Sequence, residues 1–241
     1  MTNSFINPKL IAGLTTVTTL TGLIATAGVA NAAMMTKSYS DTFGLATTDI
    51  EDALLSVQKF DVSLGTLKSV KVNFDGQIVG NANVENLDAK DQTLTFDLSG
   101  NLQLMGSEIL GTLFDETANK ADSLNATAYD GTFDFGGTSG GSFSGLTAVA
   151  SGEKTYTDQS FLNAFIGDGN IDFLFSAFTN SKVTGSANIV SQINTQGGAM
   201  VSVVYEYEKT QEVPEPSVML GLGLVASAGW LSRKKITSSH Q

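Results

Sequence analysis

The residues with the most chemical potential in this sequence are four aspartates beside glycines or near the ends of apolar runs: Asp130, Asp134, Asp168 and Asp172. Glycoside hydrolysis requires two carboxyl groups, one as acid and the other as base or nucleophile, so these residues define a hydrolase hypothesis. Because aspartate beside glycine is most often a turn former, we favour a structural interpretation of all four.

Two of these aspartates also define a calcium hypothesis. Asp168 lies in the motif Gly167-Asp168-Gly169-Asn170, Asp172 follows it closely, and Ca²⁺ prefers oxygen ligands. The spacing lacks the alternating ligands and the terminal glutamate of an EF-hand. We therefore expect a tight turn and no cofactor, with a calcium ion as the alternative.

Residues for other common catalytic centres are scarce. The only histidine is His240, close to the end of the chain, and there is no cysteine. A Ser-His-Asp triad, a histidine zinc site and a thiolate nucleophile therefore find no suitable residues in the central part of the chain. We expect a protein that is not an enzyme.

The charge is strongly asymmetric along the chain. Lys9, Arg233, Lys234 and Lys235 lie outside residues 33–216, which leaves 9 of the 13 basic residues there against all 24 acidic ones, a net charge of −15. Phosphate backbones need lysine or arginine to replace their counterions, so we expect no nucleic-acid partner. The acidity is typical of a domain that stays soluble outside the cell.

Residues 1–32 have the order of parts of a secretory signal peptide. Lys9 precedes an apolar run over residues 10–29, and Ala30-Asn31-Ala32 supplies the small residues of a cleavage site. We expect a signal helix that is cleaved after Ala32, and hence an exported protein.

Between the two ends, apolar residues recur with a period of two, which sends alternate side chains to opposite faces of a strand. Glycine-containing pairs separate the runs and predict turns. The pattern predicts an all-β domain over residues 33–211, an antiparallel β-sandwich, jelly-roll-like or similar, with a barrel as the alternative. The apolar runs are Val70, Val72 and Phe74; Leu94, Phe96, Leu98, Leu102 and Leu104; Ile171, Phe173 and Phe175; and Val201, Val203, Tyr205 and Tyr207. The predicted turns are Asp75-Gly76, Asp130-Gly131, Gly136-Gly137, Gly140-Gly141, Asp168-Gly169 and Gly197-Gly198.

Two segments lack a clear period. Residues 108–127 are polar and mixed, which predicts a long loop or short helix. Residues 136–145 are rich in glycine and serine, but Phe133, Phe135 and Phe143 flank or enter the segment at strand spacing. We expect a hairpin within one domain there.

Residues 212–241 have the order of parts of a membrane-sorting signal. In Val213-Pro214-Glu215-Pro216 the prolines stop strand or helix, and residues 217–231 then form an uncharged apolar stretch before Arg233-Lys234-Lys235. Its 15 residues are fewer than the ~20 that span a bilayer core. The basic cluster is expected on the cytoplasmic side, which places the sandwich outside. A short transmembrane helix of this kind suits a transient signal better than a permanent anchor.

This order of motif, apolar stretch and basic cluster resembles the PEP-CTERM sorting signal of bacteria. The resemblance implies a membrane-embedded exosortase as processing partner, attachment to the membrane through the helix before processing, and a host that makes exopolysaccharide.

Three stretches of the central domain resemble the choice-of-anchor E domain of surface proteins. They are Phe60-Asp61-Val62-Ser63-Leu64-Gly65-Thr66-Leu67 with Val70, Phe165-Ile166-Gly167-Asp168-Gly169-Asn170-Ile171, and Val201-Ser202-Val203-Val204-Tyr205-Glu206-Tyr207. That family has no established activity, so the resemblance names no catalytic residue.

The function expected is therefore that of an exported, surface-sorted, non-enzymatic β-sandwich protein of the bacterial envelope, the outer surface or the exopolysaccharide matrix. Its role is structural or the binding of a ligand such as extracellular polysaccharide. A carboxylate-dependent polysaccharide hydrolase and a calcium-stabilised matrix protein are the alternatives.

Overall fold

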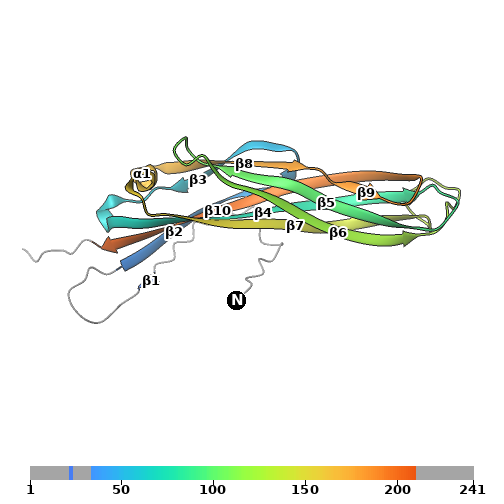
Figure 1. Ribbon diagram of the computed structural model, residues 1–241, viewed down its shortest axis with the longest axis horizontal. Helices are drawn as coiled ribbons and strands as arrows, with labels where there is room; N and C mark the ends of the chain where they lie inside the picture. Colours follow the sequence, from blue (N-terminus) through green and yellow to red (C-terminus); the bar gives the residue numbers. More distant parts are fainter. Residues whose placement is uncertain (1–21, 24–33, 210–241) are drawn as a thin grey trace, which may run out of the picture. The chain divides into compact units, whose positions relative to one another are not determined.

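The structure is a computed structural model that describes residues 22–23 and 34–209, which form antiparallel strands connected by loops and short helices (Figure 1). The prediction of an all-β antiparallel sandwich is confirmed. The strands are β1 (Gly22–Leu23), β2 (Met34–Thr47), β3 (Ile50–Gln58), β4 (Gly65–Asn86), β5 (Gln92–Met105), β6 (Thr112–Ala126), β7 (Gly140–Tyr156), β8 (Asn170–Thr179), β9 (Lys182–Thr184) and β10 (Ile189–Lys209). The helices are η2 (Val62–Leu64), α1 (Gln159–Leu162) and η3 (Asn163–Phe165).

The strands form two sheets. Sheet A has the order β1-β2-β10-β4-β7, and sheet B has the order β3-β8-β5-β6 with β9 also pairing with β5. The antiparallel pairs β5–β6, β4–β7, β3–β8 and β2–β10 are nested in sequence, as in one long hairpin rolled over itself. This strand order is that of a jelly roll, which packs two sheets face to face.

Alternation along the strands places the apolar residues between the sheets. Val70, Val72 and Phe74 of β4 are completely buried, while the intervening Lys71 and Asn73 are partly exposed. The inward assignments made from the period of two are confirmed in β4, β5, β8 and β10. Since each buried aliphatic or aromatic side chain contributes about 1.5–3 kcal/mol, this parity is the main source of stability.

The three stretches that resemble a choice-of-anchor E domain meet in one aromatic cluster. The ring of Phe60 lies 5.7 Å from that of Tyr205 and 5.2 Å from that of Tyr207, and Phe165 lies 6.5 Å from Tyr205. The Tyr205 hydroxyl donates a 2.8 Å hydrogen bond to the carbonyl of Gln58, and burial raises the pKa of Tyr205. These stretches therefore close one end of the sandwich.

Three predicted glycine turns are wrong. Gly76 lies inside β4, Gly140-Gly141 begins β7, and Gly197-Gly198 lies inside β10 beside a bulge. At Gly76 a Cβ would lie 2.9 Å from the Leu102 side chain of the opposite sheet, so this glycine serves close packing between the sheets rather than a turn. The turns at Gly131, Gly137 and Gly169 are confirmed by positive φ angles of 95°, 62° and 87°.

The predictions for residues 108–127 and 136–145 are also wrong. Most of the first segment is strand β6, and it reads as irregular because it is an edge strand of sheet B with only a few buried side chains. The second does not form a hairpin: β7 pairs with β4 in sheet A, whereas the preceding strand β6 belongs to sheet B. Phe143 is buried in β7, whereas Phe133 is 55% exposed and Phe135 has a φ of +57° in the preceding loop.

A substitution at Gly100 of β5 would test how closely the two sheets approach each other. A Cβ at this position would collide with Ile78 of sheet A and lie 2.6 Å from the backbone oxygen of Phe178, which cannot rotate away. We predict that Gly100→Ala lowers the free energy of unfolding by about 1–3 kcal/mol. Urea unfolding followed by circular dichroism measures this. Gly136→Ala, where the nearest neighbour is an aspartate side-chain oxygen at 3.1 Å, is the matched control. Equal effects of the two changes would contradict the packing argument.

Candidate functional site

The residues of the expected targeting signals lie outside the described part of the chain. This applies to Ala30 and Ala32 of the cleavage site, to Val213, Pro214, Glu215 and Pro216 of the sorting motif, and to Arg233, Lys234 and Lys235 of the basic cluster. Within the described residues, the helices are all too short to cross a membrane.

Asp130 and Asp134 lie in the loop between β6 and β7, and each organises a turn. Asp130 Oδ1 accepts a 2.9 Å hydrogen bond from the backbone N–H of Thr132, and Asp134 Oδ1 accepts one of 2.7 Å from the N–H of Gly136. Both contacts are the aspartate turns that local side-chain bonding produces. The turn interpretation of these residues is confirmed.

Asp168 and Asp172 occupy different environments. Asp168 lies in the exposed turn before β8, whereas Asp172 lies on β8 and accepts a 2.7 Å hydrogen bond from Ser56 Oγ of β3. The N–H of Ser56 donates to Asp41 Oδ2 of β2 at 2.7 Å. Within residues 34–209 we find no group of three or more His, Cys, Asp or Glu placed to hold a metal ion.

The two aspartate pairs lie at opposite ends of β4. The loop of Asp130 and Asp134 packs beside the last residues of β4, since Ser139 Oγ donates to Glu85 Oε1 at 2.6 Å. The turn of Asp168 lies near its first residues, where the Lys59 N–H donates to the Gly169 carbonyl at 2.9 Å. β4 has 22 residues, so the pairs are on the order of 65 Å apart. A glycosidase needs carboxyl groups roughly 5–9.5 Å apart, so the pairs cannot act together.

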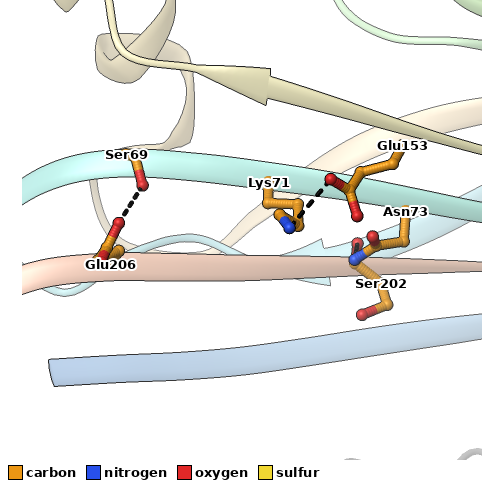
Figure 2. Close-up of polar contacts among 6 residues, drawn as sticks. All are labelled: Ser69, Lys71, Asn73, Glu153, Ser202 and Glu206. Atoms are coloured by element: carbon orange, nitrogen blue, oxygen red, sulfur yellow. Dashed lines mark hydrogen bonds and ion pairs between the residues drawn. The ribbon is translucent and has the colours of Figure 1, made fainter. Parts of the chain in front are cut away.

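The outward face of sheet A divides into two chemically different halves. Figure 2 shows the first half, where polar groups pair across neighbouring strands: Ser69 Oγ donates to Glu206 Oε2 at 2.8 Å, and Lys71 Nζ lies 2.9 Å from Glu153 Oε1. A second ion pair joins Lys68 and Glu208 at 2.8 Å. The polar groups of this half are largely satisfied by one another.

The second half carries five carboxamide side chains that are at least partly exposed on adjacent strands, which we call the amide face: Asn81 and Asn83 of β4, and Gln192, Asn194 and Gln196 of β10. Gln77 of β4 shares their parity but is buried. The register places Asn83 opposite Gln192 and Asn81 opposite Asn194. These positions point away from the core, because the neighbouring Ala82, Val84 and Ile193 face or pack against it.

Few of these amide groups are used within the described structure. Asn81 Oδ1 accepts a 2.8 Å bond from the Gly145 N–H, and Asn83 Oδ1 accepts one of 2.9 Å from Ser142 Oγ. Gln192, Asn194 and Gln196 make no side-chain hydrogen bond with any other residue of the described range. The amide face therefore presents both donors and acceptors outward.

The amide face is also free of charge. Residues 76–84 of β4, 140–152 of β7 and 183–205 around β10 contain no Asp, Glu, Lys, Arg or His. The chain as a whole has a net charge of −11. A charge-free sector that spans three neighbouring strands of so acidic a chain is the most distinctive surface property of the described structure.

A buried polar network holds the end of this sector. Asn86 is fully buried, and its amide nitrogen donates to the carbonyls of Lys90 at 2.8 Å and Thr127 at 2.6 Å. Its oxygen accepts from the Asp88 N–H at 2.8 Å and from Gln92 Nε2 at 2.5 Å. All four hydrogen-bonding positions of the amide are occupied, which fixes the loops that frame the last residues of β4.

Sequence reasoning missed the amide face. Its signals are present, since Asn81 and Asn83 are two residues apart, as are Gln192, Asn194 and Gln196, and a run of 23 uncharged residues begins at Val183. Period two puts each set on one face of its strand. The juxtaposition of the two sets follows only from the pairing of β4 with β10.

Comparison with known proteins identifies no family: no family model matches the chain, and no curated protein matches it. Among solved structures the chain shows a slight similarity to the infectious bursal virus derived T=1 particle, with 10% identity over 79% of this chain and 47% of the other, and a TM-score of 0.13. The infectious bursal disease virus Gx strain gives 10% identity, 90% and 55% coverage, and a TM-score of 0.13. The chain thus spans about half the length of these structures.

The calcium hypothesis is testable on the folded chain. A cation held by Asp168 and Asp172 would stabilise the native state in proportion to the logarithm of its concentration. Asp172 accepts a hydrogen bond from Ser56, and residues 34–209 hold no group of three or more His, Cys, Asp or Glu placed to bind a metal ion. We therefore predict that millimolar calcium leaves the Tm unchanged in differential scanning calorimetry. Magnesium serves as the control ion. A calcium-specific rise in Tm that Asp172→Asn abolishes would contradict this prediction.

Proposed function

We propose that this chain is an exported, surface-sorted and non-enzymatic β-sandwich protein of the bacterial envelope or exopolysaccharide matrix. The observation that carries the proposal is the order of parts after the sandwich: Val213-Pro214-Glu215-Pro216, the uncharged residues 217–231, and Arg233-Lys234-Lys235. In this proposal an exosortase-type membrane enzyme recognises the tail, and the family is that of choice-of-anchor E domains.

The distribution of the core supports this division of the chain. Every buried hydrophobic residue of the described structure lies between Tyr39 and Tyr207. Residues 1–32, proposed as a signal helix, and residues 212–241, proposed as a sorting tail with a short transmembrane helix, lie outside that span. Of residues 1–32 the structure describes Gly22–Leu23, the two-residue strand β1, which pairs with β2. Cleavage at both ends would therefore leave the core complete.

A binding or structural role agrees with the chemistry of the described residues. The pairs Asp130/Asp134 and Asp168/Asp172 lie at opposite ends of β4, too far apart to form one glycosidase site together. The outward face of sheet A offers hydrogen-bonding side chains over many strand positions, which suits contact with an extended molecule better than chemistry on a small one.

We predict that the mature protein at the cell surface begins at Ala33 and has lost the residues after the Pro-Glu-Pro motif. Intact-mass spectrometry of surface-exposed protein from the host measures both ends. Replacing Pro214, Glu215 and Pro216 together by alanine should leave residues 217–241 attached and hold the protein in the membrane fraction. Gln211→Ala, in the adjacent polar spacer, is the control that should be processed normally. Intact residues 217–241 on surface-exposed wild-type protein would indicate a plain anchor and sink the processing claim.

A further inference from the structure

We propose that the amide face of sheet A is the binding surface for an uncharged, hydroxyl-rich polysaccharide. The inference rests on the proposed function for the place of action, but its evidence is the surface itself. It assigns the ligand class and the residues that contact it: Asn81, Asn83, Gln192, Asn194 and Gln196.

The hydrogen-bonding chemistry of the face matches a polyol. A sugar hydroxyl both donates and accepts, and a carboxamide offers two donors and two acceptor positions. Gln192, Asn194 and Gln196 spend none of these on described residues, and Asn81 and Asn83 spend their oxygens but not their amide nitrogens. A ligand can therefore engage these groups without first breaking hydrogen bonds to other residues of the described structure.

The spacing of the face suits an extended polymer. Neighbouring strands lie about 4.8 Å apart, and side chains on one face recur about every 6.8 Å along a strand. With Asn83 opposite Gln192 and Asn81 opposite Asn194, the amides form two successive cross-strand rows. Gln196 lies opposite Val79 and adds a third row. A polysaccharide that crosses these rows can form hydrogen bonds with amides in each of them. A single small molecule would reach only one row.

Apolar side chains on the same face complete the match. Val79 is the cross-strand neighbour of Gln196 and of Thr147, and Val149 of β7 is 69% exposed. Sugar rings carry C–H faces beside their hydroxyls, so a ligand needs both polar and apolar contacts. Valine among amides supplies them together.

The lack of charge selects the kind of polysaccharide. A cationic polymer would be drawn to carboxylates, and these lie elsewhere on the chain. An anionic polymer would be repelled by a chain with 24 acidic residues. A neutral polymer is neither attracted nor repelled by these charges. It can bind the amide face without the cost of desolvating a charged group.

A second copy of this chain is the competing occupant, because an uncharged face also lowers the repulsion between identical molecules. Each copy still has a net charge of −11, which opposes that association, whereas a neutral glycan is not repelled. The observations therefore favour the polysaccharide, and self-association becomes an outcome of the test.

The test is affinity gel electrophoresis of the full chain through gels that contain dextran, hydroxyethyl cellulose or a galactomannan, with alginate as the anionic probe. We expect retardation by at least one neutral polymer and none by alginate. The double change Gln192→Ala with Asn194→Ala should weaken the retarding interaction about tenfold, since each lost hydrogen bond contributes about 0.5–1.5 kcal/mol.

Asn119→Ala with Asn125→Ala, two exposed amides on the outward face of β6 in sheet B, is the matched control and should bind as the wild type does. The isosteric pair Gln192→Glu with Asn194→Asp should also lose binding while keeping side-chain shape, which separates contact from folding. Thermal unfolding checks that each variant is folded.

Three results would overturn the inference. They are equal binding by the wild type and the Gln192/Asn194 variants, equal retardation by alginate, and no retardation by any neutral polymer. Dimers that those variants dissociate in sedimentation velocity, without any change in glycan retardation, would assign the face to a second copy. None of these results bears on tail processing, which the mass of the mature protein reports separately.

Discussion

The antiparallel ladder between β4 and β10, which have 22 and 21 residues, determines the arrangement of both faces of sheet A. It runs from the pair Gly65–Lys209 to the pair Asn86–Ile189 with a single register shift near Glu206. Because side chains alternate, this one register decides both which residues enter the core and which form the outward face. A slip by one residue would bury the amides of β10 and expose Val201, Val203 and Tyr205.

The two ends of that ladder are secured by different chemistry. At one end Phe60, Phe165, Tyr205 and Tyr207 pack as rings, with one buried hydroxyl satisfied by the Gln58 carbonyl. At the other end the fully buried Asn86 forms four hydrogen bonds with the surrounding loops and with Gln92. Aromatic packing tolerates small shifts, whereas a satisfied amide does not, so the second end holds its loops and the adjoining amide face more strictly.

Sequence patterns predicted the parts of this fold that depend on one face being buried, and missed those that depend on pairing. Val70, Val72 and Phe74 could be assigned inward because burial imposes a period of two. Gly76 was wrongly predicted to form a turn. The side chain that a Cβ there would approach, Leu102 of the opposite sheet, is distant in sequence, so no local pattern shows it. β6 was missed because an edge strand buries little. The aspartates were correctly interpreted as turn formers at Asp130 and Asp134, since that chemistry is local. The amide face depends on the pairing of Asn83 with Gln192 across β4 and β10, which no local pattern contains.

The two proposals are connected by the question of how the protein stays at the cell surface after its tail is removed. A sandwich whose tail is removed is no longer held by the bilayer, and its acidity repels the anionic surfaces and polymers that commonly surround bacteria. Any hold on its surroundings must then come from hydrogen bonds and apolar contacts made by a surface without charge. The amide face has those properties, and its rows lie in the continuous ladder between β4 and β10. A rigid ladder keeps the five amides in fixed rows, so less conformational entropy is lost when a polymer is bound.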